Sequence, residues 1–138
     1  MEKHKKILNK LKVLGFKPKN ILDIGAYKGI WTDNCKKIFP KSNYFLIEAN
    51  ERNELKNKGK HITAILSDEI KEVDWYKKNI SGDSYYKETT SFYKDCLPIR
   101  KKTNTLENLF KEEIFDLIKI DVQGAELDVM RGGINIIK

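Results

Sequence analysis

Acidic residues and glycines stand where short apolar runs of this sequence end, and their types and spacing suit a chemical role. Gly25 follows the run 21–24, Glu48 ends the next run along the chain, and Asp121 ends a later one. A carboxylate in such a position can accept hydrogen bonds from hydroxyl groups or remove a proton from one. These strand ends are therefore the first candidates for a functional site.

Residues 25–29, Gly-Ala-Tyr-Lys-Gly, join a β-branched apolar run to a helical pattern of apolar positions. The run has the length and composition of a strand buried on both faces. Because glycines permit positive φ values and close backbone approach, a ligand can lie against this turn, near the start of the helix. Dinucleotide-binding turns have the spacing G-x-G-x-x-G, and Tyr27 stands where the second glycine would be. The turn therefore predicts a cofactor cradle that suits a pyrophosphate poorly.

Glu48 is predicted to lie at the tip of the second strand, beside that turn. An acid there can accept hydrogen bonds from both hydroxyls of a ribose. Ser67 and Asp68 follow a third apolar run, 61–66, and are predicted to lie beside the adenine of a bound nucleoside. The alternative for this pair is an ordinary surface turn. Together, the glycine turn and Glu48 indicate nucleoside binding.

The elements that must position these residues alternate between strands and helices along the chain. This alternation predicts an α/β fold with a parallel sheet in the order 3-2-1-4, joined by right-handed crossovers. The polar strand ends then share the carboxyl edge, where open α/β sheets hold their ligands. The predicted elements are a helix over 3–14, strands over 21–24, 44–48, 61–66 and 116–121, short antiparallel strands over 73–76 and 99–103, and helices over 50–58, 105–110 and beyond 126.

Several packing and capping contacts follow from these elements. The first helix carries one apolar stripe, predicted to pack on the sheet edge or over the cofactor mouth, with a membrane-surface helix as the alternative. Asn50 and Thr105 are predicted to cap the helices that begin beside them. The apolar stripe of the first helix consists of Ile7, Leu8, Leu11 and Leu14. The last helix is predicted to face the core with Leu127, Val129 and Met130 and to end at Gly132-Gly133.

Composition limits the class of protein. The 138 residues suit a single domain, 1–138, with an N-terminal helix within 1–16. The segment 78–98 lacks periodic structure and predicts a substrate-facing lid, with disorder as its rival. No apolar stretch suits a membrane span or signal peptide, and two cysteines without metal-like spacing favour free thiols, so a cytoplasmic protein with no metal and no membrane partner is expected.

The charge balance is basic, at +7 overall, which invites a nucleic-acid interpretation. However, three of the 27 basic residues are arginine, the side chain that reads base edges and phosphates best. The lysines are scattered and favour solvated faces. A nucleic-acid partner is therefore disfavoured.

The motifs ILDIGAYKGIWT, FLIEAN, TLENLF and IKIDVQGAELDVMRG together resemble the FkbM-type methyltransferases, which use S-adenosylmethionine (SAM). The resemblance covers roughly residues 18 to 133, and the last motif is characteristic of the family. It implies a Rossmann-like SAM-methyltransferase fold with helices on both faces of the sheet. It also implies methyl transfer to a hydroxyl oxygen of a sugar or other small molecule. In the motif TLENLF, Glu107 stands where members of the family usually have aspartate (Thr-Leu-Asp). Thr90-Ser91 stands roughly where the family has two serines, which is a weak match.

The resemblance further implies which residues form the site. Methyl transfer to a hydroxyl needs in-line positioning and a base near the methyl group, and Asp121 is the expected base. Glu126 either reaches the acceptor or favours its helix dipole, and Gln123 is a weaker candidate for orienting substrate. The predicted catalytic residues are Asp121 and Glu126, and the predicted cofactor-binding residues are Asp23, Gly25, Ala26, Tyr27, Gly29, Glu48, Ala49, Ser67, Asp68 and Asp121.

Three other functions remain open from the sequence: a catalytically incomplete SAM-binding or nucleoside-binding module, an RNA methyltransferase, and an NAD-dependent oxidoreductase disfavoured by the missing third glycine. Family members continue with further strands after the helix that ends at Gly132, and this sequence lacks them. The strand ending at Asp121 is then expected at an exposed sheet edge, which soluble proteins usually cover. We expect either a homo-oligomer that covers this edge or a piece of a longer product.

Overall fold

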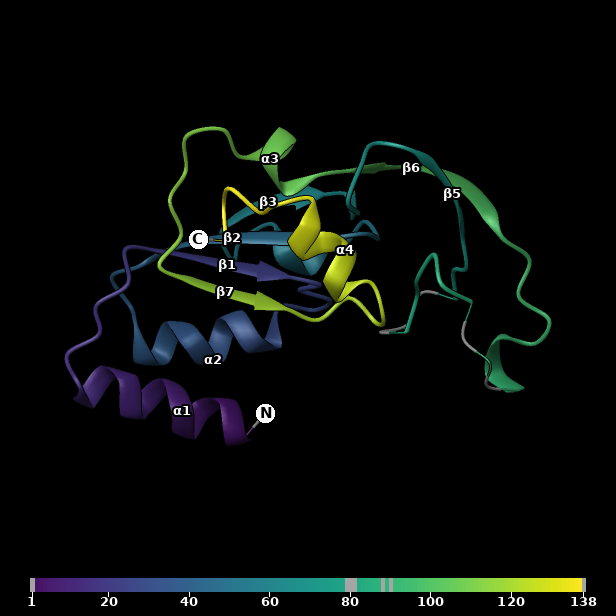
Figure 1. The fold of residues 1–138 in the computed structure, drawn as a ribbon. Helices are drawn as coiled ribbons and strands as arrows, with labels where there is room; N and C mark the ends of the chain where they lie inside the picture. The colour runs from purple at the N-terminus through teal and green to yellow at the C-terminus, as the bar shows by residue number, and fades with distance from the viewer. Residues whose placement is uncertain (1, 79–81, 88, 90, 138) are drawn as a thin grey trace. The chain divides into compact units, whose positions relative to one another are not determined.

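A computed structural model of the chain describes residues 2–78, 82–87, 89 and 91–137 (Figure 1). For Phe92 it describes the backbone only. Part of the predicted lid, including Thr90, lies outside these residues. The chain divides into two compact units, Met1–Thr63 with Ile114–Lys119, and Ala64–Glu113 with Ile120–Lys138. The elements are α1 (Glu2–Val13), β1 (Asn20–Ile24), α2 (Ile30–Ile38), β2 (Asn43–Glu48), η1 (Asn53–Leu55), β3 (Lys60–Thr63), β4 (Ile65–Leu66), β5 (Glu72–Trp75), η2 (Ser91–Tyr93), β6 (Ile99–Asn104), α3 (Leu106–Leu109), β7 (Leu117–Ile120) and α4 (Glu126–Arg131).

A four-stranded sheet in the order β3-β2-β1-β7 forms the centre of the first unit, which confirms the predicted order. β1 and β2 run parallel with Ile24 opposite Ile47, and β2 and β3 run parallel with Glu48 opposite Thr63. Four of the five β1 residues are buried, as a central strand requires. Every residue of β7 is only half-buried, and β7 lies at the edge of this sheet.

Two helices complete the first unit, and α2 lies between α1 and the sheet (Figure 1). α2 buries Trp31, Cys35 and Ile38 in the core. From α1, Leu8 is buried and Leu11 packs against the same core. The predicted apolar stripe of α1 was therefore only half right. Ile7 is 58% exposed and Leu14 is 73% exposed.

The third predicted strand, 61–66, is not continuous. It breaks at Ala64 into β3, which pairs with β2, and β4, which pairs in parallel with β6. β4 belongs to the second unit, where it forms a three-stranded sheet in the order β4-β6-β5. Ser67 and Asp68 therefore follow a strand of this smaller sheet, and the prediction that they end a strand of the larger sheet was wrong.

The predicted helix over 50–58 was also wrong. The structure has a single 3-10 turn, η1, with Arg52 at the N-cap position. The N–H group of Asn50 instead donates to the Glu48 carboxylate, at 3.1 Å, so Asn50 belongs to the strand end and does not cap a helix.

The second unit confirms most of its predicted elements. β5 and β6 pair antiparallel, and the Thr105 hydroxyl accepts from Asn108 N at the start of α3. Val129 of α4 is fully buried, and Gly132 follows the last residue of the helix. The predictions for Leu127 and Met130 were wrong, since they are 57% and 43% exposed.

No helix among the described residues combines the length and apolar character needed to cross a bilayer. The two cysteines, Cys35 and Cys96, are both free and buried. Burial raises the pKa of the Cys35 thiol to about 11.

Candidate functional site

The turn after β1 adopts the left-handed conformations that its glycines permit. Gly25, Tyr27 and Gly29 have φ values of 72°, 51° and 70°. Gly29 also lies against η1, because a Cβ added there would come within 2.4 Å of Lys58 Cδ and 3.0 Å of Leu55 Cδ2. The φ value of 70° favours glycine at this position, and a larger residue would also have to displace the Lys58 side chain.

Most backbone N–H groups of this turn donate within the protein. Those of Gly25 and Ala26 donate to Ile47 O, at 2.9 and 3.1 Å. The N–H of Gly29 donates to Ala26 O at 2.7 Å. A phosphate-binding turn needs several N–H groups aimed at the ligand, so this turn is a poor phosphate cradle.

Glu48 joins the tip of β2 to the turn after β1. Its Oε2 accepts from Tyr27 N at 2.8 Å, and its Oε1 accepts from Asn50 N at 3.1 Å. The side chain is buried, at 8% exposure of the residue. The predicted meeting of the second strand's acid with the first strand's turn is therefore present as a direct contact. Ala49, the next predicted cofactor residue, is half-buried.

The ring of Tyr27 lies beneath a cation. The Arg52 guanidinium lies 4.3 Å from the ring centroid, within the range of a cation–π contact. This stacking fixes the aromatic side chain of the turn, whose backbone is held by Glu48.

Asp23 is fully buried behind the turn. Its Oδ2 accepts from the Thr32 hydroxyl at 2.7 Å, and its Oδ1 lies 3.0 Å from Lys119 Nζ as an ion pair without an aligned hydrogen bond. The ammonium group of Lys119 also donates to Gly25 O at 2.8 Å. Asp23, predicted to bind cofactor, is thus engaged by Thr32 and by Lys119, and Lys119 in turn bonds to the first carbonyl of the turn.

Lys119 was missed by sequence reasoning. Its signal was a single cation inside the apolar strand Leu-Ile-Lys-Ile, where an unpaired charge would be costly. The structure explains the residue by its pairing with a buried acid of the neighbouring strand.

In the second unit, Ser67 and Asp68 contact each other. The buried Ser67 hydroxyl donates to Asp68 Oδ1 at 2.9 Å, and Lys71 Nζ donates to the same oxygen at 2.7 Å. The hydrogen bond from Lys71 lowers the pKa of the Asp68 carboxyl. Gly132 packs directly on this pair, since a Cβ there would lie 2.1 Å from Ser67 O.

The two predicted catalytic acids follow β7 and have different surroundings: Asp121 is exposed, and Glu126 is hydrogen-bonded to the backbone. Asp121 is exposed, and its Oδ1 accepts from Gln123 Nε2 at 3.3 Å. The two carboxylate oxygens of Glu126 accept from Val122 N at 3.1 Å and from Gly124 N at 3.0 Å. Gln123 has a φ of 55°, so this turn is conformationally demanding. Glu126 thus stabilises the turn that follows Asp121, a contact that the sequence did not predict.

Asp128 on α4 binds two tyrosines of the predicted lid segment, which belongs to the same unit. Its Oδ2 accepts from the phenol hydroxyls of Tyr85 at 2.9 Å and Tyr86 at 2.6 Å. The Tyr85 hydroxyl oxygen also lies 3.3 Å from the Ser67 hydroxyl oxygen. Burial raises the pKa of the Tyr85 phenol, and the bond to Asp128 raises the pKa of Tyr86. The part of the predicted lid that contains these tyrosines is therefore fastened to α4.

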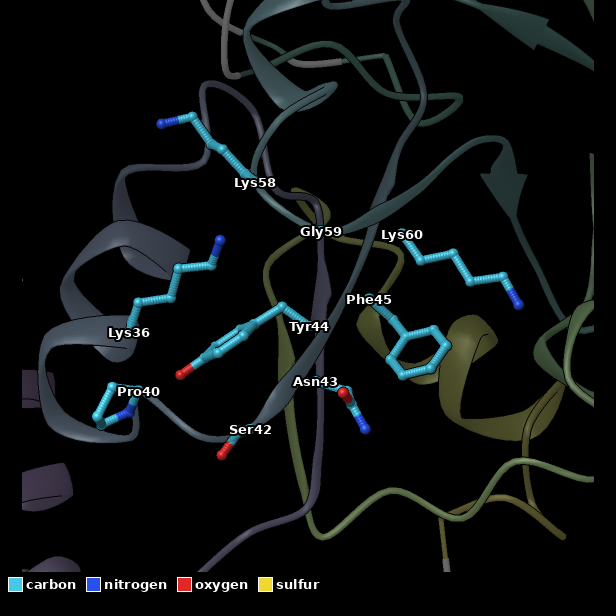
Figure 2. A pocket seen from close by; sticks show the side chains of 9 residues that line it. All are labelled: Lys36, Pro40, Ser42, Asn43, Tyr44, Phe45, Lys58, Gly59 and Lys60. Atoms are coloured by element: carbon cyan, nitrogen blue, oxygen red, sulfur yellow. The ribbon is translucent and has the colours of Figure 1, made fainter.

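A separate hollow of about 550 Å³ lies at the amino end of β2, away from Glu48 (Figure 2). Tyr44 and Phe45 point to opposite sides of the strand, with Lys36 near Tyr44 and Lys60 near Phe45. Ligands of parallel sheets bind at the opposite, carboxyl end, so this hollow is not the predicted cofactor site. It is lined by Lys36, Pro40, Ser42, Asn43, Tyr44, Phe45, Lys58, Gly59 and Lys60.

The comparison with known families decides the class of protein. A family model described as "Methyltransferase FkbM domain" matches residues 23–138. The chain belongs to this family. No curated protein and no solved structure matches it. The FkbM assignment agrees with the parallel sheet flanked by helices and supports methyltransferase activity in general.

The FkbM match covers all the predicted site residues, which the structure describes in two groups. The first unit brings together Asp23, the turn from Gly25 and Glu48. The second unit holds Ser67 and Asp68 against the end of α4, and Asp121 beside the start of that helix. In the described residues, no group of three or more His, Cys, Asp or Glu side chains is arranged to hold a metal ion.

Proposed function

We propose that this FkbM-family chain is a SAM-dependent O-methyltransferase that acts on a hydroxyl of a sugar or another small molecule. The observation that carries the proposal is the contact between the Glu48 carboxylate and the backbone of the Gly25–Gly29 turn. It joins the two strand ends that a single adenosyl ligand would have to touch. The family match supports the class of reaction.

The hydrogen-bonding state of the turn favours SAM over a dinucleotide. Gly25, Ala26 and Gly29 donate their N–H groups inside the protein, and Tyr27 donates its own to Glu48. SAM carries no phosphate, so it does not need these donors. This observation weighs against the NAD-dependent alternative.

Glu48 retains the capacity to hold a ribose. An ionised carboxylate has about four lone-pair sites, and two backbone N–H groups use two of them. The remaining sites suit two hydroxyl donors. Because both oxygens are already held by the backbone, the carboxylate is preorganised for that contact.

Bound SAM would supply an activated methyl group on a sulfonium. The chain must orient an acceptor hydroxyl and take its proton, and Asp121 is the proposed base. It is exposed at the end of β7, where an acceptor can reach it. Glu126 acts as a positioning residue, because both of its oxygens hold the 122–124 turn next to Asp121.

Turnover tests this proposal. Purified chain is mixed with SAM and a panel of sugars and small alcohols, and S-adenosylhomocysteine formation is measured. We expect Asp121→Asn to reduce the rate with an accepted substrate by about 100-fold to 10,000-fold. SAM binding without product from any acceptor would favour the incomplete binding module. The absence of SAM binding would contradict the proposal.

A further inference from the structure

The first helix presents a solvent-facing side that the core does not use. Leu8 and Leu11 face the core, and α2 separates α1 from the sheet (Figure 1). Leu14 N donates to Lys10 O at 3.0 Å, so the helical path continues one residue beyond Val13. We call the exposed side next to this core-facing row the outer face of α1, formed by Lys3, Lys6, Ile7, Lys10, Val13 and Leu14.

Helical spacing places these six residues together. Lys3, Ile7, Lys10 and Leu14 follow one another at steps of four, three and four residues, and Lys6, Lys10 and Val13 form the neighbouring row. Ile7, Val13 and Leu14 are 58%, 86% and 73% exposed. Single exposed apolar residues are ordinary, but three aliphatic side chains on one short helix face indicate a binding surface.

The charge of α1 indicates the kind of partner. The helix carries five lysines, and Glu2 is its only acid. Lysines interleaved with protruding aliphatic side chains suit an anionic lipid surface, where the ammonium groups meet headgroups and the aliphatic groups enter the acyl boundary. RNA recognition favours arginine and stacking aromatic side chains, and the outer face of α1 has neither.

We propose that the outer face of α1 docks the protein on an anionic bilayer surface. Ile7, Val13 and Leu14 enter the headgroup region, and Lys3, Lys6 and Lys10 contact the anionic headgroups. The sequence predicts no membrane partner and predicts that the apolar stripe of α1 packs on the sheet edge or over the cofactor mouth, with a membrane-surface helix as the alternative. The exposure of Ile7 and Leu14 supports that alternative. The inference does not depend on methyl transfer.

Vesicle co-sedimentation of the full chain tests the proposal. Vesicles of phosphatidylcholine alone are compared with vesicles that also contain phosphatidylserine, at low and high salt. We expect binding to the anionic vesicles, weakened by salt, and little binding to the neutral ones. Val13→Ser with Leu14→Ser should weaken binding by at least about tenfold. Each of Lys3→Gln, Lys6→Gln and Lys10→Gln should weaken it by about fivefold.

Matched control variants test whether vesicle binding is specific to the outer face of α1 or is shared by other exposed apolar and basic residues. Ile114 is 78% exposed in the same unit, and Ile114→Ser should leave vesicle binding unchanged. Lys101→Gln with Lys102→Gln removes two exposed charges of β6 and should have less effect than two changes on α1. Circular dichroism checks that each variant is folded, which the exposure of the replaced side chains favours.

Three results of the vesicle experiment would overturn the proposal. They are no binding to anionic vesicles, equal binding to neutral and anionic vesicles, and anionic binding that the Val13 and Leu14 changes do not alter. Salt-sensitive binding of a single-stranded RNA through the same lysines, without vesicle binding, would assign the face to nucleic acid and would also overturn it.

Discussion

Glu48 shows how one side chain can be both structural and a candidate for binding. Its two oxygens hold backbone N–H groups on both sides of the site, Tyr27 N and Asn50 N. Removing the Glu48 carboxylate would leave these two N–H groups without this acceptor, which costs folding free energy. Any variant of Glu48 must therefore be tested for folding as well as for ligand affinity.

At the same scale, the Asp23–Lys119 pair is predicted to be essential for stability. Lys119→Met removes the cation and leaves a fully buried carboxylate, so the free energy of unfolding should fall by about 3 kcal/mol. Urea unfolding at neutral pH measures this. The double variant Lys119→Met with Asp23→Asn should recover part of the loss, because no unpaired charge remains. A loss below about 1 kcal/mol in the single variant would contradict this role for the pair.

At the scale of elements, the close contact between α4 and Ser67 predicts a large effect of a small change. Gly132→Ala places a Cβ 2.1 Å from Ser67 O and 3.2 Å from Asp68 Cα, and backbone atoms cannot rotate away. We expect a loss of at least about 2 kcal/mol in unfolding free energy. Gly124→Ala is the control, because its Cβ meets nothing within 4 Å and only its φ of 96° is strained, at about 1 kcal/mol. Equal losses would argue against the packing explanation.

The tyrosine contacts of α4 predict a dependence on pH. The bond to Asp128 raises the pKa of the Tyr86 phenol in the folded state above its ordinary value near 10. This contribution to stability is therefore complete below that ordinary value and is lost as pH rises through the folded-state pKa. We measure the free energy of unfolding across this alkaline range. As pH rises, it should fall more steeply for wild type than for Tyr86→Phe. Parallel curves would show that the contact does not contribute.

The sequence predicted the elements better than their junctions. Alternation of strands and helices was enough to order the four-stranded sheet, because right-handed crossovers leave few alternatives. The break at Ala64 was not visible, since the apolar pattern continues through 61–66 while the pairing partner changes from β2 to β6. Asn50 was misread because its N–H serves Glu48, a contact between side chain and backbone that no propensity describes. The family motif located the candidate site residues, and only coordinates revealed Lys119.

At the scale of the whole molecule, the edge position of β7 raises the question of assembly. In the part of the chain that the structure describes, no strand of the four-stranded sheet pairs with the outer side of β7. We expect a second copy to pair there, because open edges attract other strands. Light scattering during size exclusion should then give a mass above the 16.1 kDa of one chain. A monomer at every concentration tested would remove this expectation.

The central claim is that the turn after β1 and Glu48 together hold SAM. Calorimetric titration of SAM into wild type, Glu48→Ala and the exposed control Glu54→Ala tests it most directly. The expected result is binding to wild type and to Glu54→Ala with equal affinity, and binding to folded Glu48→Ala that is weaker by about 1 to 3 kcal/mol. Unchanged affinity in folded Glu48→Ala, or no binding to wild type, would contradict the claim.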